Sequence, residues 1–273
     1  MRLHPPRIIT RWPLAILALL LLAACRRAPL PPPVLLFDQG HGERFLSQGQ
    51  GELDLSHLKE ILAQGGFQVK ASDPGQVFTD DLLQGVSTLV ISGPFTPIDP
   101  PEIAAIKKFL NRGGQLCVML HIAAPAANLL NALGLEVSNG VIHEPVNTET
   151  PEQPTNFFVT DLAPHPLTKG LTRFHLYGVW ALHTENRADI IAQTSPQAWV
   201  DLRHDGSREF GPGDVRQAFS VVVVGQSGHG QFVAFGDDAI FQNRFLTGQN
   251  ERLAENLAAW LKAGSYYLAN EPR

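Results

Sequence analysis

The sequence predicts an α/β protein with a mostly parallel β-sheet and a β-rich elaboration. In its first half, runs of apolar residues alternate with amphipathic segments of helical period, which is typical of strand–helix–strand units. Between about residues 135 and 216, repeated prolines break this pattern into short extended pieces. Hydrophobic residues make up 44% of the chain and charged residues 17%, which favours a globular fold over a disordered chain.

The body opens with a predicted strand, helix and second strand. Residues 34–38 form an apolar run that ends in an aspartate, as expected for a strand buried on both faces. The next segment places its apolar residues on one helical stripe: Leu55, Leu58, Ile61 and Leu62. Two glycines at 65 and 66 end this helix, and residues 67–71 are interpreted as the second strand.

A third strand, a capped helix and a fourth strand follow. Residues 87–92 are the third strand. Asp99 as N-cap, Pro100 at the first helical position and Glu102 in a capping box mark the clearest helix start in the chain. Residues 115–121 are the fourth strand. Strands separated by helices predict parallel pairing with right-handed crossovers.

Residues 135–216 are interpreted as an elaboration of the same sheet, with extended pieces at 156–159, 174–177 and 198–202. A β-hairpin follows, in which 218–224 and 231–235 flank a glycine-containing turn. The final helix is expected to begin near Asn250 and to end at Gly264. We therefore expect one α/β domain over residues 34–264 and a tail at 265–273.

The first 24 residues have the features of a secretory signal. Residues 1–13 contain arginines and no acid, and residues 14–24 are all apolar. This run is too short to span a bilayer, which takes about 20 residues. It ends in Leu22-Ala23-Ala24-Cys25, which resembles the bacterial lipobox, whose cysteine is acylated after cleavage before it. We expect a lipoprotein signal peptide at 1–24 and lipidation at Cys25. An ordinary signal peptide with a chance cysteine and a short anchor are the alternatives.

Residues 25–33 are rich in proline and are expected to form a stiff tether between the lipid and the domain. Cleavage removes three arginines and no acid, so the formal charge changes from −5 to −8. Arg26 stands where retention in the inner membrane requires Asp, which slightly favours the outer membrane in a host with two membranes. The predicted location is the bacterial cell envelope, facing the periplasm or the exterior.

Composition excludes several classes of protein. The net charge of −5 and the lack of a basic block beyond the first arginines argue against a nucleic-acid partner. Two cysteines exclude a disulfide scaffold and a Cys-rich zinc module. No cofactor is predicted, although ten histidines leave a His/Asp/Glu site for a divalent metal open.

Polar residues follow the predicted strands at the edge where ligands bind in an open parallel sheet. The candidate ligand-binding residues are Asp38, His41, Glu43, Ser92, His121, Asp237, Asp238 and Asn243. Carboxylates and imidazoles gathered there suit metal binding, sugar binding or acid–base chemistry. Each residue also has a structural interpretation as a cap, a turn or a loop contact. For His41 we expect a binding role, so that alanine at this position leaves stability nearly unchanged.

Three motifs resemble those of a known class of domains. Residues 37–42 (FDQGHG) are similar to its opening turn, and residues 165–171 (HPLTKGL) to a stretch also found in trehalose-utilisation-type proteins. Residues 236–238 (GDD), with Asn243 and the helix around Asn256 and Trp260, are similar to its closing motif. Over residues 34–262 the chain resembles uncharacterised class I glutamine-amidotransferase-like domains related to gliding-motility-type ABC-transporter accessory proteins. The resemblance implies a flavodoxin-like three-layer sandwich.

The chain departs from active amidotransferases of this fold at the nucleophile. Those enzymes carry a cysteine within G-x-C-x-G at a sharp turn after a strand. The corresponding segment, 117–123, has no cysteine or serine at the turn and no flanking glycines. Cys117 lies inside the predicted strand, where a buried hydrophobic role is common. Thiol catalysis is therefore not expected.

Three function classes remain. The first is a non-catalytic envelope lipoprotein that binds a partner protein or a small polar ligand, as an accessory of a membrane transport complex. The second is a metal-assisted hydrolase that uses Asp38, His41, His121 and Asp238. The third is a purely structural subunit of a membrane complex. We favour the first, because the nucleophile is missing, the chain has a predicted lipid anchor, and the resemblance implies such a setting. The predicted partners are the membrane, through Cys25, and an envelope protein.

Overall fold

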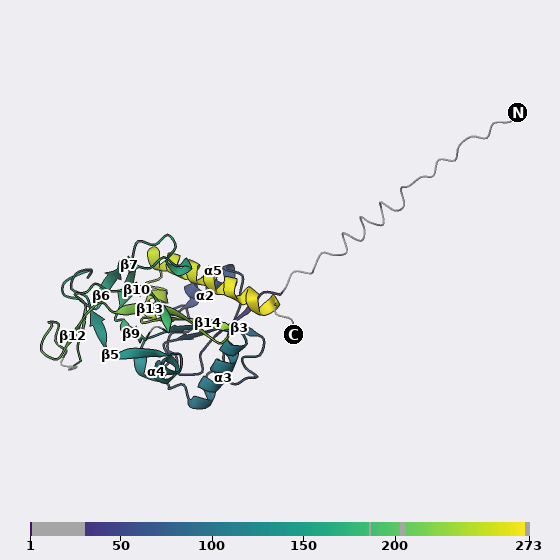
Figure 1. Ribbon diagram of the computed structural model, residues 1–273, viewed down its shortest axis with the longest axis horizontal. Helices are drawn as coiled ribbons and strands as arrows, with labels where there is room; N and C mark the ends of the chain where they lie inside the picture. Colours follow the sequence, from purple (N-terminus) through teal and green to yellow (C-terminus); the bar gives the residue numbers. More distant parts are fainter. Residues whose placement is uncertain (2–30, 186, 203–205, 271–273) are drawn as a thin grey trace. The chain divides into compact units, whose positions relative to one another are not determined.

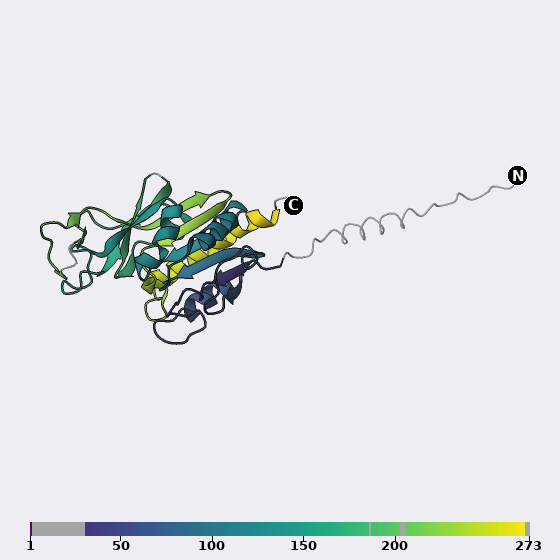
Figure 2. The same cartoon turned by 90° about the horizontal axis from the view of Figure 1, so that it is seen from below.

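The computed structural model describes Met1 and residues 31–185, 187–202 and 206–270. The rest of the predicted signal peptide, Cys25 and the first part of the tether lie outside these residues. From Pro33 onward the chain forms one compact unit, drawn in Figures 1 and 2. Within the described ranges, no helix combines the length and the apolar character needed to cross a bilayer.

Strands outnumber helices in this unit. The helices are α2 (Ser56–Gln64), α3 (Pro100–Asn111), α4 (Ala123–Ala132) and α5 (Gln249–Asn270), with 3-10 turns η1 (Pro166–Thr168) and η2 (Ala239–Phe241). The strands of the first half are β1 (Val34–Phe37), β2 (Gln68–Ala71), β3 (Val86–Ser92), β4 (Gln115–Met119), β5 (Leu135–His143), β6 (Asn156–Val159) and β7 (Asp161–Leu162). Those of the second half are β8 (Phe174–Tyr177), β9 (Trp180–Thr184), β10 (Ala188–Gln193), β11 (Trp199–Val200), β12 (Val215–Arg216), β13 (Ser220–Ser227) and β14 (Gly230–Phe235).

Five strands form a parallel half of the sheet in the order β2-β1-β3-β4-β14. Doubly wound flavodoxin-like sheets have the same order, and they bind ligands at the carboxyl ends of the strands. Val90 of β3 pairs with both Phe37 of β1 and Cys117 of β4. The three central strands therefore deliver the loops that follow them to one edge.

The other half of the sheet is antiparallel, which corrects the prediction of a mostly parallel sheet. β13 pairs with β14 through the predicted hairpin, and β9, β5, β11 and β12 continue the sheet with antiparallel neighbours. Between β5 and β14 the described chain contains no α-helix, and strands joined without a crossover helix pair antiparallel. β6 and β8 form a separate two-stranded sheet. The fold is α/β, but its sheet is large and mixed.

Helices cover both faces of the parallel half, as Figures 1 and 2 show. Leu35 and Phe37 of β1 belong to a core with α2 and α5, whereas Leu36 belongs to a second core with α3 and α4. Side chains alternate between the faces of a strand, so burial on both faces explains the continuous apolar runs. The sequence did not predict α4, because its N-cap residue, Ile122, offers no side-chain cap and its first turn has no acid.

The last helix does not end at Gly264 as predicted, because α5 continues to Asn270. A β-carbon at Gly264 would lie 2.6 Å from the side-chain oxygen of Gln115 in β4. The Gln115 amide donates to Leu261 O at 2.7 Å and to Ser265 Oγ at 3.1 Å. Glycine at this position therefore serves close packing of the helix on the sheet and does not terminate the helix.

Candidate functional site at the carboxyl edge of the parallel strands

The loops after β1, β3, β4 and β14 carry the predicted site residues, and the structure divides these among three kinds of surroundings. The first is a buried network around His41, and the second is a half-exposed pair at the ends of β4 and β14. The third comprises residues that belong to neither group. The network contains Asp38, His41 and Glu43, the pair contains His121 and Asp238, and the separate residues are Ser92, Asp237 and Asn243.

The buried network centres on His41, which is 3% exposed. Its Nδ1 lies 2.8 Å from Asp38 Oδ2, and its Nε2 lies 3.0 Å from Glu102 Oε1. Asp38 Oδ1 also accepts from Gly40 N at 3.0 Å, and Glu102 Oε1 accepts from Phe78 N at 2.8 Å. The Phe78 ring stacks on the imidazole with 4.8 Å between centroids. Both ring nitrogens of His41 are therefore occupied, and they connect the loop after β1 to the first turn of α3.

The charges around His41 decide the protonation of the network. Burial alone would lower the pKa of His41, but the hydrogen bond and charge of Asp38, with the charges of Glu102 and Glu43, raise it to about 9. At neutral pH His41 is an imidazolium that donates from both ring nitrogens. Burial and the neighbouring Asp38 raise the pKa of Glu43 to about 8. Glu43 Oε2 accepts from His41 N at 2.8 Å, while its buried Oε1 has no hydrogen-bond partner among the described residues.

The same network contains a set of donors that could hold a metal ion. One ligand atom from each of Asp38, His41 and Glu43 lies within 4.8 Å of the others. A histidine ligand binds a metal through one unprotonated nitrogen and donates from the other. Because each nitrogen of His41 already faces a carboxylate, an ion would have to displace either Asp38 or Glu102 from the ring.

The half-exposed pair consists of His121, just after β4, and Asp238, just after β14. His121 Nδ1 lies 3.0 Å from Asp238 Oδ1, and the side chains are 37% and 1% exposed, respectively. A β-carbon at Gly93, which has a φ of +60°, would lie 2.6 Å from Asp238 Oδ2. Glycine at this position therefore leaves room for the buried carboxylate. The hydrogen bond to Asp238 raises the pKa of His121 against the effects of burial and of the Arg44 charge. Asp238 thus orients the ring through Nδ1, and the described residues give Nε2 no hydrogen-bond partner.

Two phenyl rings and a cation surround His121. The Phe45 ring meets the imidazole edge-on with 4.9 Å between centroids, and the Phe95 ring lies at 5.5 Å. The guanidinium carbon of Arg44 lies 4.5 Å above the centre of the Phe95 ring. On the other side, Trp180 Nε1 donates to the backbone oxygen of His121 at 3.0 Å. This edge therefore presents an imidazole nitrogen, a guanidinium and apolar rings together.

Asp237 is held by backbone contacts rather than directed at a ligand. It accepts from Tyr177 N at 2.6 Å and from Ala239 N at 2.8 Å. Burial and the charge of Asp238 raise its pKa well above the usual range. Ser92 ends β3 with a buried hydroxyl that has no hydrogen-bond partner in the described part of the chain.

Asn243 connects a loop to a helix, in agreement with its structural interpretation. Its amide nitrogen donates to Gly51 O at 2.8 Å and to Ser56 Oγ at 3.0 Å. Its oxygen accepts from His57 N at 2.9 Å. These contacts hold the segment before α2 in place, so the geometry gives Asn243 a structural role.

Cys117 lies in the middle of β4 and is fully buried. Burial alone raises the pKa of its thiol far above the ordinary value. The thiolate is the nucleophilic form of cysteine, so a buried, protonated thiol is inert.

Sequence reasoning missed two residues at this edge. It treated Glu102 only as a capping residue, and its Oε2 does accept from Asp99 N at 3.0 Å. Its other oxygen contacts His41, 61 positions away, and no local signal could reveal that contact. Arg44 stands beside the candidate Glu43, and its charge in the first strand-end loop was the available signal.

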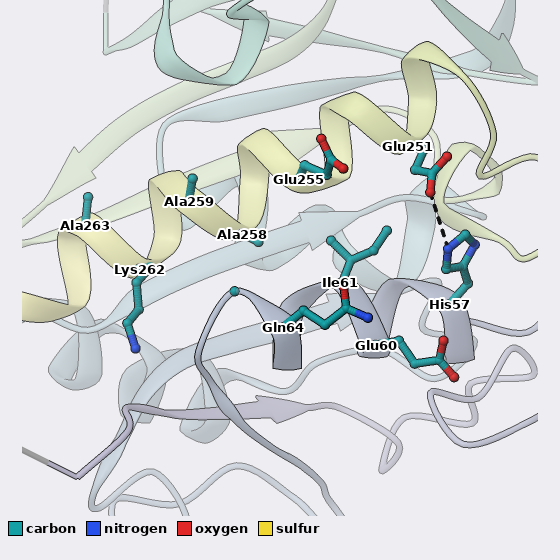
Figure 3. Close-up of a pocket in the computed structure, with 11 residues that line it drawn as sticks. His57, Glu60, Ile61, Gln64, Glu251, Glu255, Ala258, Ala259, Lys262 and Ala263 are labelled. Carbon is teal, nitrogen blue, oxygen red and sulfur yellow. Dashed lines mark ion pairs between the residues drawn. The ribbon is translucent and has the colours of Figure 1, made fainter.

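A groove of about 990 Å³ lies between α2 and α5, on a face of the sheet (Figure 3). Ile61, Ala258 and Ala259 contribute small and apolar side chains to it, and the His57–Glu251 ion pair crosses one end at 3.6 Å. None of the eight predicted residues lines this groove. Its size therefore gives no support to the predicted site.

Comparison with known proteins identifies the fold and no more. The chain matches no protein-family model and no curated protein. The mmIFT52 N-terminal domain is similar in structure, with a TM-score of 0.66 and 18% identity over 84% of this chain and 97% of that one. The cytoplasmic protein STM1381 from Salmonella typhimurium LT2 has a TM-score of 0.54 and 16% identity, covering 86% of this chain and 98% of its own. A protein from Parabacteroides merdae described as ThuA-like has a TM-score of 0.51 and 15% identity, covering 86% of this chain and 91% of its own.

These similarities agree with the implied class I glutamine-amidotransferase-like fold. ThuA-like proteins have that fold, and the order of the parallel strands fits its flavodoxin-like relatives. The added antiparallel strands make the sheet larger and more mixed than the three-layer sandwich that the sequence predicted. At 15–18% identity a shared fold does not transfer an activity.

Proposed function

We propose that this protein is a lipid-anchored cell-envelope protein whose α/β domain binds a small polar ligand without thiol catalysis. The observation that carries ligand binding is the His121–Asp238 pair, whereas the anchor is proposed from the Leu22–Cys25 motif. A buried carboxylate orients a half-exposed imidazole, and Phe45 and Phe95 flank that imidazole. A few oriented polar groups beside aromatic surface are the usual composition of a small-molecule site. On the resemblance described above, the proposed partner is a membrane transport complex.

Lipid anchoring is tested by replacing the predicted acylation site. In Cys25→Ala we expect complete loss of fatty-acid labelling, together with release from membranes or accumulation of uncleaved precursor. Metabolic labelling with an alkyne fatty acid and fractionation of the envelope measure both effects. Cys117→Ala is the matched control, because its thiol is buried in β4. Normal labelling of Cys25→Ala would contradict the anchor.

Ligand binding is tested with a photo-crosslinking residue beside His121. Ile122 is 37% exposed and follows His121 directly, whereas Val215 is 39% exposed and lies on β12 at the far edge of the sheet. We expect illumination of intact cells to give a defined small adduct from position 122 and none from position 215. Mass spectrometry of the purified protein identifies the adduct. Equal labelling at both positions, or none at 122, would contradict a ligand site at this edge.

Metal-assisted hydrolysis is the alternative that one observation favours, namely the close donor set of Asp38, His41 and Glu43. In such a site, one ring nitrogen of His41 would contact the ion in place of the carboxylate of Asp38 or Glu102. Elemental analysis of the purified full chain tests this alternative. A stoichiometric divalent metal that is lost in Glu43→Gln supports it, and a metal-free protein of full stability contradicts it.

A further inference from the structure

We propose that the surface formed by His121, Arg44 and the first turn of α4 binds an oxyanion, which is the carboxylate or phosphate group of a small organic ligand. This inference rests on the proposed function, because it names the chemical class of ligand for the same edge of the sheet. It uses three independent positive features that converge on one place, on a protein whose net charge is negative.

The first feature is the second ring nitrogen of His121, Nε2. Asp238 Oδ1 accepts from Nδ1 at 3.0 Å, which fixes the tautomer and leaves Nε2 on a side chain that is 37% exposed. The hydrogen bond to Asp238 raises the pKa of His121 and so favours the imidazolium form, in which Nε2 is a hydrogen-bond donor. An N–H donor on a cation forms a charge-assisted hydrogen bond with an oxyanion.

The second feature is Arg44, in the loop after β1. Its guanidinium carbon lies over the Phe95 ring, 4.5 Å from the centroid, and the centroid of that ring lies 5.5 Å from that of the imidazole. The charge of Arg44 is close enough to lower the pKa of His121. Among the described residues no carboxylate forms an ion pair with Arg44. Arg44 therefore brings to the surroundings of His121 a positive charge that no ion pair in the described part of the chain neutralises.

The third feature is the start of α4, two residues after His121. This helix has ten residues, its N-cap Ile122 supplies no side-chain acceptor, and its first turn contains no acid. Ala123 and Ala124 of this turn have backbone N–H groups that lie at the positive end of the helix dipole, whereas Pro125 has none. An anion at this position satisfies amides that no side chain satisfies.

The aromatic rings beside these groups indicate the chemical character of the rest of the ligand. Phe45 meets His121 edge-on at 4.9 Å, and Trp180 donates to the His121 backbone, which places its indole nearby. Apolar rings next to a positive centre fit a small organic acid or phosphate ester better than a bare inorganic ion. Binding of the bare ion is therefore expected to be weak but measurable.

The test uses full-length acylated protein in detergent, titrated separately with sodium phosphate and sodium acetate at constant ionic strength. Tryptophan fluorescence and thermal unfolding report binding, since a ligand of the native state raises the unfolding midpoint. We expect a saturable response to at least one anion, with Kd on the order of 1–10 mM. A response to phosphate alone points to a phosphate ester, and a response to acetate alone points to a carboxylate.

Arg44→Gln is expected to weaken binding at least about tenfold, which corresponds to about 1.4 kcal/mol. Arg216→Gln is the matched control, because Arg216 stacks on Phe210 at 3.8 Å and lies on β12 at the far edge of the sheet. Equal effects of the two substitutions, or no saturable response up to about 100 mM of either anion, would overturn the oxyanion site. If adducts still form at position 122 in that case, the proposed ligand binding stands and only the oxyanion assignment fails.

Discussion

His41 and His121 follow β1 and β4, which lie on either side of β3 in one sheet, and each has its Nδ1 within 3.0 Å of an aspartate oxygen. They differ at the second nitrogen. Nε2 of His41 meets the buried Glu102, whereas the side chain of His121 is 37% exposed. The Asp–His contact alone therefore does not distinguish a structural histidine from an available one. Burial of the ring and the partner of its second nitrogen make that distinction.

The sharpest test of this comparison is alanine at each histidine. His41→Ala leaves Asp38 and Glu102 buried without the cation between them, and removing one partner of a buried ion pair costs about 3–5 kcal/mol. His121→Ala removes one hydrogen bond at a partly exposed site, at a cost of about 1–2 kcal/mol. Urea unfolding of the two variants at pH 7 measures the difference.

This expectation for His41 is opposite to the one drawn from its sequence position, which assigned it a binding role and little effect on stability. Equal destabilisation by the two substitutions would show that the buried network contributes no more than the exposed pair. Phe78→Leu serves as a control, because it removes the ring stacked on His41 and keeps both ion pairs.

The second test varies pH. His41 has its pKa raised from 6.5 to about 9, so its stabilisation is complete below pH 6.5 and is lost as pH rises through 9. Glu43 has its pKa raised from 4.5 to about 8, so the folded state binds its proton more tightly and stability falls between pH 4.5 and 8. The raised pKa values of His41 and Glu43 both predict that the free energy of unfolding decreases from pH 5 to pH 9.5.

Glu43→Gln isolates one of these contributions. Glutamine resembles the protonated acid, so the variant is expected to be more stable than the native protein at pH 9, by about 1–2 kcal/mol after allowance for solvent screening. Denaturant unfolding across the pH range measures the effect, and the two proteins converge near pH 5. A variant that is less stable at pH 9 would show that Glu43 is ionised in the fold.

The smallest expected effect concerns the exposed pair alone. Asp238→Asn keeps an oxygen beside His121 Nδ1 but removes the charge, so the pKa of His121 is expected to fall. NMR titration of the histidine ring protons follows this change, and the pKa of His41 serves as the internal control. An unchanged pKa of His121 would mean that Asp238 is itself protonated at neutral pH, as burial favours.

The sequence by itself determined the features that depend on neighbouring residues. Asp99, Pro100 and Glu102 predict the start of α3 correctly, because a capping box joins residues three positions apart. The apolar runs of β1, β3 and β4 predict strands buried on both faces, and the glycine-containing turn predicts the β13–β14 hairpin. The sequence also identified candidate site residues by their positions just after predicted strands, namely Asp38, His41, His121 and Asp238.

Only the tertiary structure decided which of these residues meet and what they do. The contacts from His41 to Glu102 and from His121 to Asp238 span 61 and 117 positions, and no periodicity encodes such a pairing. The antiparallel half likewise depends on which strands pair, and the helix at Gly264 continues because Gln115 packs against it. The physical reason is common to all three: caps, turns and amphipathic stripes act within a few residues, whereas burial and the partner of a polar atom depend on the whole fold.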